Sequence, residues 1–484
     1  MRYVFVLMIL VLFKEISAAR DADTCVTNEE CSAELNKSYM CQNNVCVHED
    51  IWPVTVRKSI GLLLSLIVSA FINAGGIGGS ALIIPIYMKA FRFVIKEAVP
   101  LTKATIFGAT FVSFCVNIFK RQARDPSQPL IDHQVTAYVL GLALAGTSVG
   151  VILMRVLPAE VILIWMVGYM FYFSHYVTRR AWTYHQRESL ELLREKAAAD
   201  LLRTQGGTGE GSEQPMRVKS SETVLQQSDT VTEPKQIGFF AMLRPHIKFI
   251  VLSFLSFVII LTASMLQGGR GMKSVIGIED GSLGWFGIFF AGQCANIGLS
   301  LSLGFGVNKK FRQMRQARDV IIETEAGKAE SVEAGTSAGT VGEVLSRSFQ
   351  IFCGGIVSGS VGVGGGIVVS LFLLDSGYSP QRSAAICATV TMYTTLSTAL
   401  QFLVGGFFSL KNAFILSAFT MLGSYLGNVL IDRLIKRYRR QAILLWIIAA
   451  VTITSTLVMS ALGFSQLTER NAVLEFGGSY APQP

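Results

Sequence analysis

The sequence contains little charge for its length. Asp, Glu, Lys and Arg together make up 15% of the 484 residues, whereas soluble proteins carry about 25%. Apolar residues make up 51% of the chain, and the mean hydropathy is +0.47. A soluble multidomain protein is therefore excluded. We expect an all-α polytopic membrane protein, with the lipid bilayer as its first partner.

The signatures of common enzymes are also missing. The five histidines form no metal-spaced pair within an apolar run, and no G-x-S-x-G motif follows a strand. The glycine run "GVGGG" (362–366) has neither the register of G-x-G-x-x-G nor a Walker lysine. We therefore expect no enzyme activity, no cofactor and no bound metal. The net charge of +9 is interpreted as a sign of membrane orientation, and not of a nucleic-acid partner.

The N-terminus carries the features of a secreted segment. Residues 1–19 resemble a signal peptide, with an uncleaved anchor as the alternative. Four cysteines follow within 22 residues, and we expect them to form two disulfides of unknown pairing: Cys25, Cys31, Cys41 and Cys46. Zinc binding is the alternative, although no C-x-x-C pair is present. Asn36 begins a glycosylation sequon, "NKS". The N-terminus is therefore expected outside the cytoplasm, in the secretory pathway or at the plasma membrane.

Apolar runs divide the rest of the chain. They cover about 59–91, 104–119, 134–153, 159–177, 247–267, 283–305, 347–374, 383–404, 411–431 and 441–462. The expected order is a signal peptide (1–19), an extracytoplasmic cysteine-rich module (20–56), a first transmembrane repeat (57–178), a cytoplasmic linker (179–243), two transmembrane helices (244–306), a second cytoplasmic linker (307–345), a second transmembrane repeat (346–463) and an extracytoplasmic tail (464–484). Regulatory domains are the alternative for the two linkers, which are too polar to form a core.

Two of the apolar runs are too long for one crossing, and glycines interrupt both. The breaks are Gly75–Gly79 in the first run and Gly362–Gly366 in the second. If each broken run crossed once, basic loops such as 120–124 would lie outside. If each is a re-entrant hairpin, the basic loops lie in the cytoplasm, as positive loops prefer. The charges therefore favour eight crossings and two hairpins.

The two breaks also align with each other. At an offset of 286 residues, Gly76, Gly78 and Gly79 fall on Gly362, Gly364 and Gly365. Five crossings separate the copies in the hairpin topology, so the repeats would be inverted, as in many transporters. A helix broken inside a membrane exposes unpaired N–H groups, and an anion can satisfy them.

At these residues the chain resembles the TauE/SafE family of sulfite-exporter-like permeases. The resemblance rests on "AGGIGGSALIIPIYM" and "VGVGGGIVVSLFLL", and on the following spans "AVPLTKATIFGA" and "SAAICATVTMYTTL". It covers about residues 57–462. The cysteine module and the long central loop are similar to the eukaryotic branch. The resemblance implies export or exchange of small sulfur-containing anions.

The candidate anion-binding residues surround the two breaks. They are Gly76, Gly78, Gly79, Ser80, Thr102, Lys103, Gly362, Gly364, Gly365, Gly366 and Thr389. Lys103 is a charge at the start of a span, and either contacts an anion or extends to the membrane surface. The hydroxyls either donate to an anion or pack helices together. Near other span ends, Arg382 and Trp285 are interpreted as interface anchors, with a partner-charge role as the alternative for Arg382.

The leading hypothesis is a secondary transporter of small anions such as sulfite or sulfonates, working by alternating access. The alternatives are an anion channel, or a membrane receptor or scaffold that binds through the cysteine-rich module. The sequence leaves open whether identical chains assemble into an oligomer.

Overall fold

The structure is a computed structural model of the chain. It describes residues 39–42, 45–48, 50–73, 80–122, 128–205, 242–268, 274–278, 282–325, 341–362, 365–438 and 442–469. The expected signal peptide, Cys25, Cys31, Asn36, most of the first linker and residues 470–484 of the C-terminal tail lie outside these residues. The described part is a helix bundle with one small β-hairpin, β1 (Tyr39–Gln42) and β2 (Val45–His48).

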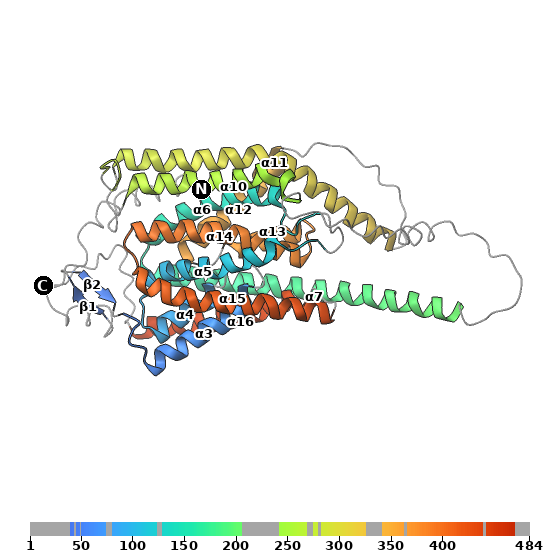
Figure 1. Cartoon of the computed structure of the whole chain (residues 1–484), viewed down its shortest axis with the longest axis horizontal. Helices are drawn as coiled ribbons and strands as arrows, with labels where there is room; N and C mark the ends of the chain where they lie inside the picture. Colours follow the sequence, from blue (N-terminus) through green and yellow to red (C-terminus); the bar gives the residue numbers. More distant parts are fainter. Residues whose placement is uncertain are drawn as a thin grey trace, which may run out of the picture.

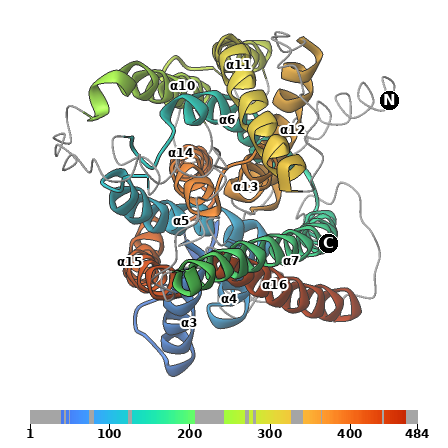
Figure 2. The same cartoon turned by 90° about the vertical axis from the view of Figure 1, so that its right-hand side faces the viewer.

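The helices run along the long axis of the molecule (Figure 1). They are α3 (Val56–Asn73), α4 (Ser80–Ala90), α5 (Ile95–Ile118), α6 (His133–Val156), α7 (Ala159–Gln205), η1 (Arg244–His246), α10 (Ile247–Gln267), α11 (Leu283–Glu325), α12 (Val341–Val361), α13 (Gly366–Asp375), α14 (Pro380–Val404), α15 (Leu410–Tyr438) and α16 (Ala442–Glu469). Viewed along that axis, α5, α13 and α14 lie near the centre, with α10 and α11 at one edge and α3 at the opposite edge (Figure 2).

Nine helices in the described part are long and apolar enough to cross a membrane. Eight of them, α5, α6, α7, α10, α11, α14, α15 and α16, coincide with the eight predicted crossings. The ninth is α3, the first arm of the first predicted hairpin. The chain is therefore an all-helical polytopic membrane protein in its main body, as predicted. Helix α7 extends well beyond its neighbours at the end away from the β-hairpin (Figure 1).

The first broken run folds back on itself. A Cβ added to Gly61, near the start of α3, would lie 2.8 Å from the ring of Phe91, directly after α4. Arg57 also donates a hydrogen bond to the backbone carbonyl of Lys89. The end of α4 thus returns to the beginning of α3, which is the geometry of a hairpin.

The second broken run also returns to its starting end. Near its beginning, Glu343 accepts a hydrogen bond from Arg312 of α11 at 2.9 Å. Just after α13, an added Cβ on Gly377 would lie 3.7 Å from Met314 Cβ, also on α11. Both ends of this run therefore lie beside the same stretch of α11, at the end of the molecule opposite the first hairpin's ends.

Each hairpin packs against a helix from the other half of the chain. Helix α12 packs on α6, and α3 packs on α15. Paired glycines bring each of these helix pairs into close approach. A Cβ on Gly355 would lie 2.9 Å from Gly146 Cα, and one on Gly359 would lie 2.9 Å from Gly150 Cα. On the other side, added Cβ atoms on Gly423 and Gly427 of α15 would collide with the carbonyl oxygens of Leu66 and Ala70 in α3.

The β-hairpin is attached to the same end as the first hairpin. His48 shares a 2.9 Å hydrogen bond with the carbonyl of Phe91, and the backbone N–H of Ile51 donates to Asn412 at 3.2 Å. Cys41 and Cys46 are directly opposed in the strand register. The predicted disulfides remain predictions, because two of their four cysteines lie outside the described residues.

Candidate functional site

The second glycine break lies at the boundary between the two halves. Helix α12 ends at Val361, Gly362 takes a positive φ of 81°, and α13 begins at Gly366. A Cβ on Gly362 would lie 2.8 Å from Val99 Cγ1 of α5 and 3.1 Å from Ile84 Cδ1 of α4. Only glycine suits both this backbone conformation and this contact. The break in the second half therefore packs directly against the first half.

Lys103 reaches the same break from α5. Its side chain is 1% exposed, and its Nζ donates to the Ser358 carbonyl oxygen at 2.7 Å and to Ser358 Oγ at 3.4 Å. Ser358 lies in the last turn of α12, where carbonyls lack partners within the helix and the helix dipole is negative. No carboxylate in the described residues forms an ion pair with Lys103. The lysine is thus a buried cation held by a helix C-terminus, and it does not extend to the membrane surface.

Ser358 also faces the start of α13. A Cβ on Gly365 would lie 3.3 Å from Ser358 Oγ and 3.6 Å from Thr394 Oγ1 of α14. The first N–H groups of α13, which have no carbonyl partner within their helix, therefore lie close to a hydroxyl that also contacts the lysine. A positive charge and a helix N-terminus come together at this point.

The predicted hydroxyl residues are buried, and the two threonines donate hydrogen bonds within their own helices. Thr102 donates to Ala98 O at 2.6 Å, and Thr389 donates to Ala385 O at 3.0 Å, each within its own helix. These bonds use the single hydroxyl proton of each threonine. Ser80 is fully buried at the first residue of α4. Of the predicted residues, the structure therefore brings together Lys103, Gly362, Gly365 and Gly366. It adds two residues that the sequence interpretation had not selected for binding, Ser358 and Thr394. Gly76, Gly78, Gly79 and Gly364 lie outside the described residues.

Asp132 is a second feature that the sequence interpretation missed. Its carboxylate is 4% exposed, caps the N-terminus of α6, and lies 2.5 Å from Lys310 Nζ and 3.1 Å from Arg382 Nη2. Tyr378 donates to it at 2.9 Å. Burial alone would raise the pKa of this carboxyl group, but the two cations and the tyrosine hydrogen bond outweigh it and lower the pKa. Arg382 is thus a partner charge, the alternative role considered for it, and Asp132 joins α6, α11 and α14.

Comparisons with known proteins agree with this architecture. The family model "Sulfite exporter TauE/SafE" matches residues 237–459, which include α10 to α15 and most of α16. "Sulfite exporter TauE/SafE family protein 1" of Arabidopsis thaliana is 23% identical over 420 residues, covering 86% of each chain. "Sulfite exporter TauE/SafE family protein 5" of the same plant is 24% identical over 407 residues, 83% of this chain and 82% of that one.

The chain is similar to TauE/SafE proteins over most of its length. Its resemblance to that family, including the plant proteins of the eukaryotic branch, is confirmed. The chain is an integral membrane protein, and the family that it resembles comprises transporters and not enzymes. No solved structure matches the chain significantly.

The described residues include no group of three or more His, Cys, Asp or Glu side chains that could hold a metal ion. His133 and His246 come within 5.7 Å between ring centroids, but this pair has no third ligand of that kind. Among the described residues, the polar groups around the second glycine break are instead hydroxyls, helix ends and the single lysine Lys103. This set suits weak, reversible binding of an anion.

Proposed function

We propose that this chain is a secondary transporter of small anions, with sulfite and sulfonates as its substrate class. The observation that carries the proposal is Lys103, a buried cation whose hydrogen-bond partners among the described residues are the carbonyl and hydroxyl oxygens of Ser358, beside a glycine-broken helix. Intramembrane charges are costly and are usually functional. A small anion between Lys103 and the N-terminus of α13 would satisfy both groups.

The proposed movement follows from the way in which the halves are interlocked. Each half places its hairpin on the long helix of the other half, α12 on α6 and α3 on α15. The glycines that permit these contacts are related by one offset, since Gly146 and Gly150 lie 277 residues before Gly423 and Gly427. This regularity supports two inverted repeats, as in transporters that rock one half against the other.

We further propose how anion binding is linked to that movement. Lys103 belongs to the first half, whereas its partner Ser358 belongs to the second. An arriving anion competes with the Ser358 carbonyl for the ammonium group, and so changes a contact between the halves. Binding can then bias one arrangement of the halves over the other, as alternating access requires.

The predicted domain order and orientation are part of the proposal. The cysteine-rich module and the face of the membrane that carries β1 and β2 would lie outside the cytoplasm, and the two linkers inside it. The attachment of the module through His48 and Ile51 gives it a structural connection to the transport domain. Removal of residues 21–50 should therefore preserve flux if the chain still folds, whereas a receptor or scaffold would lose its binding part.

The direct test is anion flux in proteoliposomes that contain the full chain. We expect the wild type to move sulfite or a small alkylsulfonate, and Lys103→Met to reduce the flux at least tenfold without lowering the melting temperature. Lys411→Gln, which removes a lysine whose side chain is 63% exposed, is the matched control and should retain flux. Lys103→Arg, which keeps the charge, provides a second variant if the methionine variant does not fold.

The outcomes separate the alternatives. Wild-type flux that Lys103→Met leaves unchanged would remove Lys103 from the site. Single-channel currents from the wild type would identify an anion channel instead of a transporter.

A further inference from the structure

Among the described residues, three ion pairs at the end of the molecule opposite β1 and β2 join the two halves of the chain. In each pair, one partner lies on or directly beside a helix of the first half, and the other lies on a helix of the second half. Figure 2 looks onto this end, with α5, α13 and α14 near its centre. The pairs are Lys120–Asp432 between α5 and α15, Asp132–Arg382 between α6 and α14, and Arg180–Asp375 between α7 and α13.

The connections between the helices gather these pairs into one group. In the first half, Lys120 and Asp132 lie at the two ends of the loop from α5 to α6, and the backbone N–H of Leu130 donates to Lys120 O at 3.0 Å across that loop. In the second half, Asp375 and Arg382 lie on either side of the short turn from α13 to α14. The same loop and the same turn therefore carry most of the charges that join the halves.

Hydrogen bonds from tyrosines reinforce two of the pairs. Tyr176 of α7 donates to Asp375 at 2.7 Å, one turn before Arg180 on the same helix. Tyr378, in the turn from α13 to α14, donates to Asp132 at 2.9 Å. Both hydrogen bonds also cross between the halves, so the contact at this end is directional as well as electrostatic.

The signs of the charges alternate around this end. The first half contributes a cation, an anion and a cation on α5, α6 and α7, and the second half contributes the three opposite charges. Complementary charges of mixed sign fix the register of two surfaces, because a shifted arrangement brings like charges together. The pattern therefore favours one closed arrangement of the halves.

These contacts can also separate at a low cost. Asp432 and Asp375 have side chains that are 28% and 37% exposed, and ion pairs that water reaches are weak. Asp132 is buried, but it has a second cation, Lys310 of α11, at 2.5 Å. Helix α11 belongs to neither repeat, so Asp132 would keep this partner when Arg382 moves away. Separation of the halves would then leave no buried carboxylate without a cation.

We propose that these three ion pairs form a latch that closes the transport path at the end opposite β1 and β2, and that the structure shows the latch closed. The proposal rests on the proposed function, because a latch has a role only if the two halves move. The latch opens when α13, α14 and α15 move away from α5, α6 and α7, and its charges then become hydrated.

A native cysteine reports whether the latch is open. Cys387 lies on α14, five residues after Arg382, and is fully buried. It belongs to the same apolar cluster as Val135 and Val139 of α6, which places it in the contact between the halves directly behind the latch. An opening that separates α14 from α6 therefore exposes the Cys387 thiol.

The test measures how fast a water-soluble thiol reagent modifies Cys387 in the folded full chain. Asp432→Asn and Asp375→Asn should each raise the rate about 2- to 5-fold, as expected for the loss of one exposed ion pair. Together they should raise it about 4- to 25-fold, because both changes act on one opening equilibrium. Lys411→Gln breaks an exposed pair with Asp50 at the other end and should leave the rate unchanged. The parent has serine in place of the other membrane cysteines, Cys115, Cys294 and Cys353, and Cys387→Ser gives the background.

Charge exchange distinguishes a latch from a general loss of stability. Lys120→Asp places two anions together and should raise the rate more than Asp432→Asn does. Addition of Asp432→Lys to that variant restores a pair of opposite charges and should return the rate to that of the parent. If the exchanged protein does not fold, Arg180→Asp combined with Asp375→Arg provides the second exchange. A rate that neutralisation leaves unchanged, or that charge exchange does not restore, would overturn the latch.

The latch and the transport proposal can fail independently. If the ion pairs control the reactivity of Cys387 but the wild type moves no sulfite or alkylsulfonate, the latch controls a movement of the halves and the transport proposal is wrong. If the wild type moves these anions but the ion pairs do not affect Cys387, transport stands and the latch is wrong. A wild type with neither property contradicts both.

Discussion

Asp132 and Lys103 are both buried charges, but the protein compensates them differently. Asp132 has two cations and a tyrosine hydroxyl as partners. Lys103 has only the carbonyl and hydroxyl of Ser358 in the described part of the chain. A fully paired charge holds elements together, whereas an incompletely neutralised one keeps capacity for a ligand. The two residues therefore have different consequences when they are replaced.

Replacement of Asp132 by asparagine should destabilise the fold. The change leaves Arg382, whose side chain is 15% exposed, without its anion. Lys310 is about one third exposed and regains hydration, so we expect a loss of about 2–3 kcal/mol, below the range for a fully buried pair. Thermal melting of the detergent-solubilised chain at pH 7 measures the effect. Lys411→Gln breaks an exposed ion pair with Asp50 and should cost less than about 1 kcal/mol.

The pH dependence of this effect has a defined sign. The pKa of Asp132 is lowered in the fold, so its contribution to stability is present above the ordinary aspartate pKa of about 3.9 and disappears as pH falls through its folded value. The difference in melting temperature between wild type and Asp132→Asn should therefore be full at pH 7 and shrink below about pH 4. A difference that stays constant to the acid limit would show that the carboxylate charge is not the cause.

At the scale of elements, paired glycines fix how the two hairpins are held. Alanine at Gly427 would drive a methyl group into the Ala70 carbonyl of α3, and alanine at Gly150 would meet the backbone of α12. Overpacking of this kind typically costs about 1–3 kcal/mol, so both variants should melt at lower temperature. Gly168 of α7 is the control, because an added Cβ there has no neighbour within 4 Å. Equal stability of Gly168→Ala and Gly427→Ala would contradict this account of the close contacts.

The elements also show what the sequence could and could not predict. The spans were predictable because each crossing needs about 20 apolar residues, and the breaks because glycines interrupt two long runs. The hydrogen-bond partner of Lys103 was not predictable, since Lys103 and Ser358 are 255 residues apart in the sequence. Asp132 lies next to a loop, and its two cationic partners come from α11 and α14. The interpretation of Trp285 as an interface anchor was wrong, because contacts with neighbouring helices leave the residue only 6% exposed.

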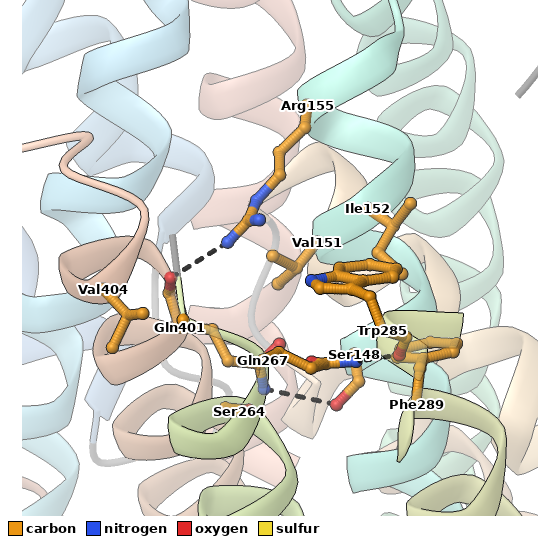
Figure 3. Close-up of a pocket in the computed structure, with 11 residues that line it drawn as sticks. Ser148, Val151, Ile152, Arg155, Ser264, Gln267, Trp285, Phe289, Gln401 and Val404 are labelled. Carbon is orange, nitrogen blue, oxygen red and sulfur yellow. Dashed lines mark hydrogen bonds between the residues drawn. The ribbon is translucent and has the colours of Figure 1, made fainter. Parts of the chain in front are cut away.

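At the scale of the whole molecule, the two ends of the bundle are not equivalent. The end with β1 and β2 has a small cavity between the ends of α6, α10 and α14 and the start of α11 (Figure 3), and the other end has the Lys120–Asp432 ion pair and the Asp132 ion pairs. Helix α7 continues past this second end (Figure 1). The ionic contacts join α5 to α15 and α6 to α11 and α14. In an alternating-access cycle, these ion pairs would have to separate when the second end opens.

The orientation of the halves can be tested by labelling single cysteines with a thiol reagent that does not cross membranes. Val56 begins α3 and is 80% exposed, and Lys89 is exposed near the end of α4. In a hairpin both positions face the same side, so Val56→Cys and Lys89→Cys should react from one side of the vesicle. Gln128→Cys, at an exposed position in the segment between α5 and α6, should react from the other side. The parent chain, with the exposed Cys115 and Cys294 replaced by serine, gives the background.

The labelling result distinguishes the two interpretations of the broken runs. If α3 and α4 together crossed the membrane once, Lys89 would react from the side opposite to Val56. The chain would then no longer contain two hairpins that enter the membrane from opposite sides with five crossings between them. The inverted relation between the halves depends on that odd number, and alternating access depends on the inverted relation. Reaction of Val56 and Lys89 from opposite sides would therefore remove the structural basis of the transport cycle, while leaving Lys103 as a binding residue. Reaction from one side supports the return of α4 toward the start of α3 that the contact of Gly61 with Phe91 already indicates.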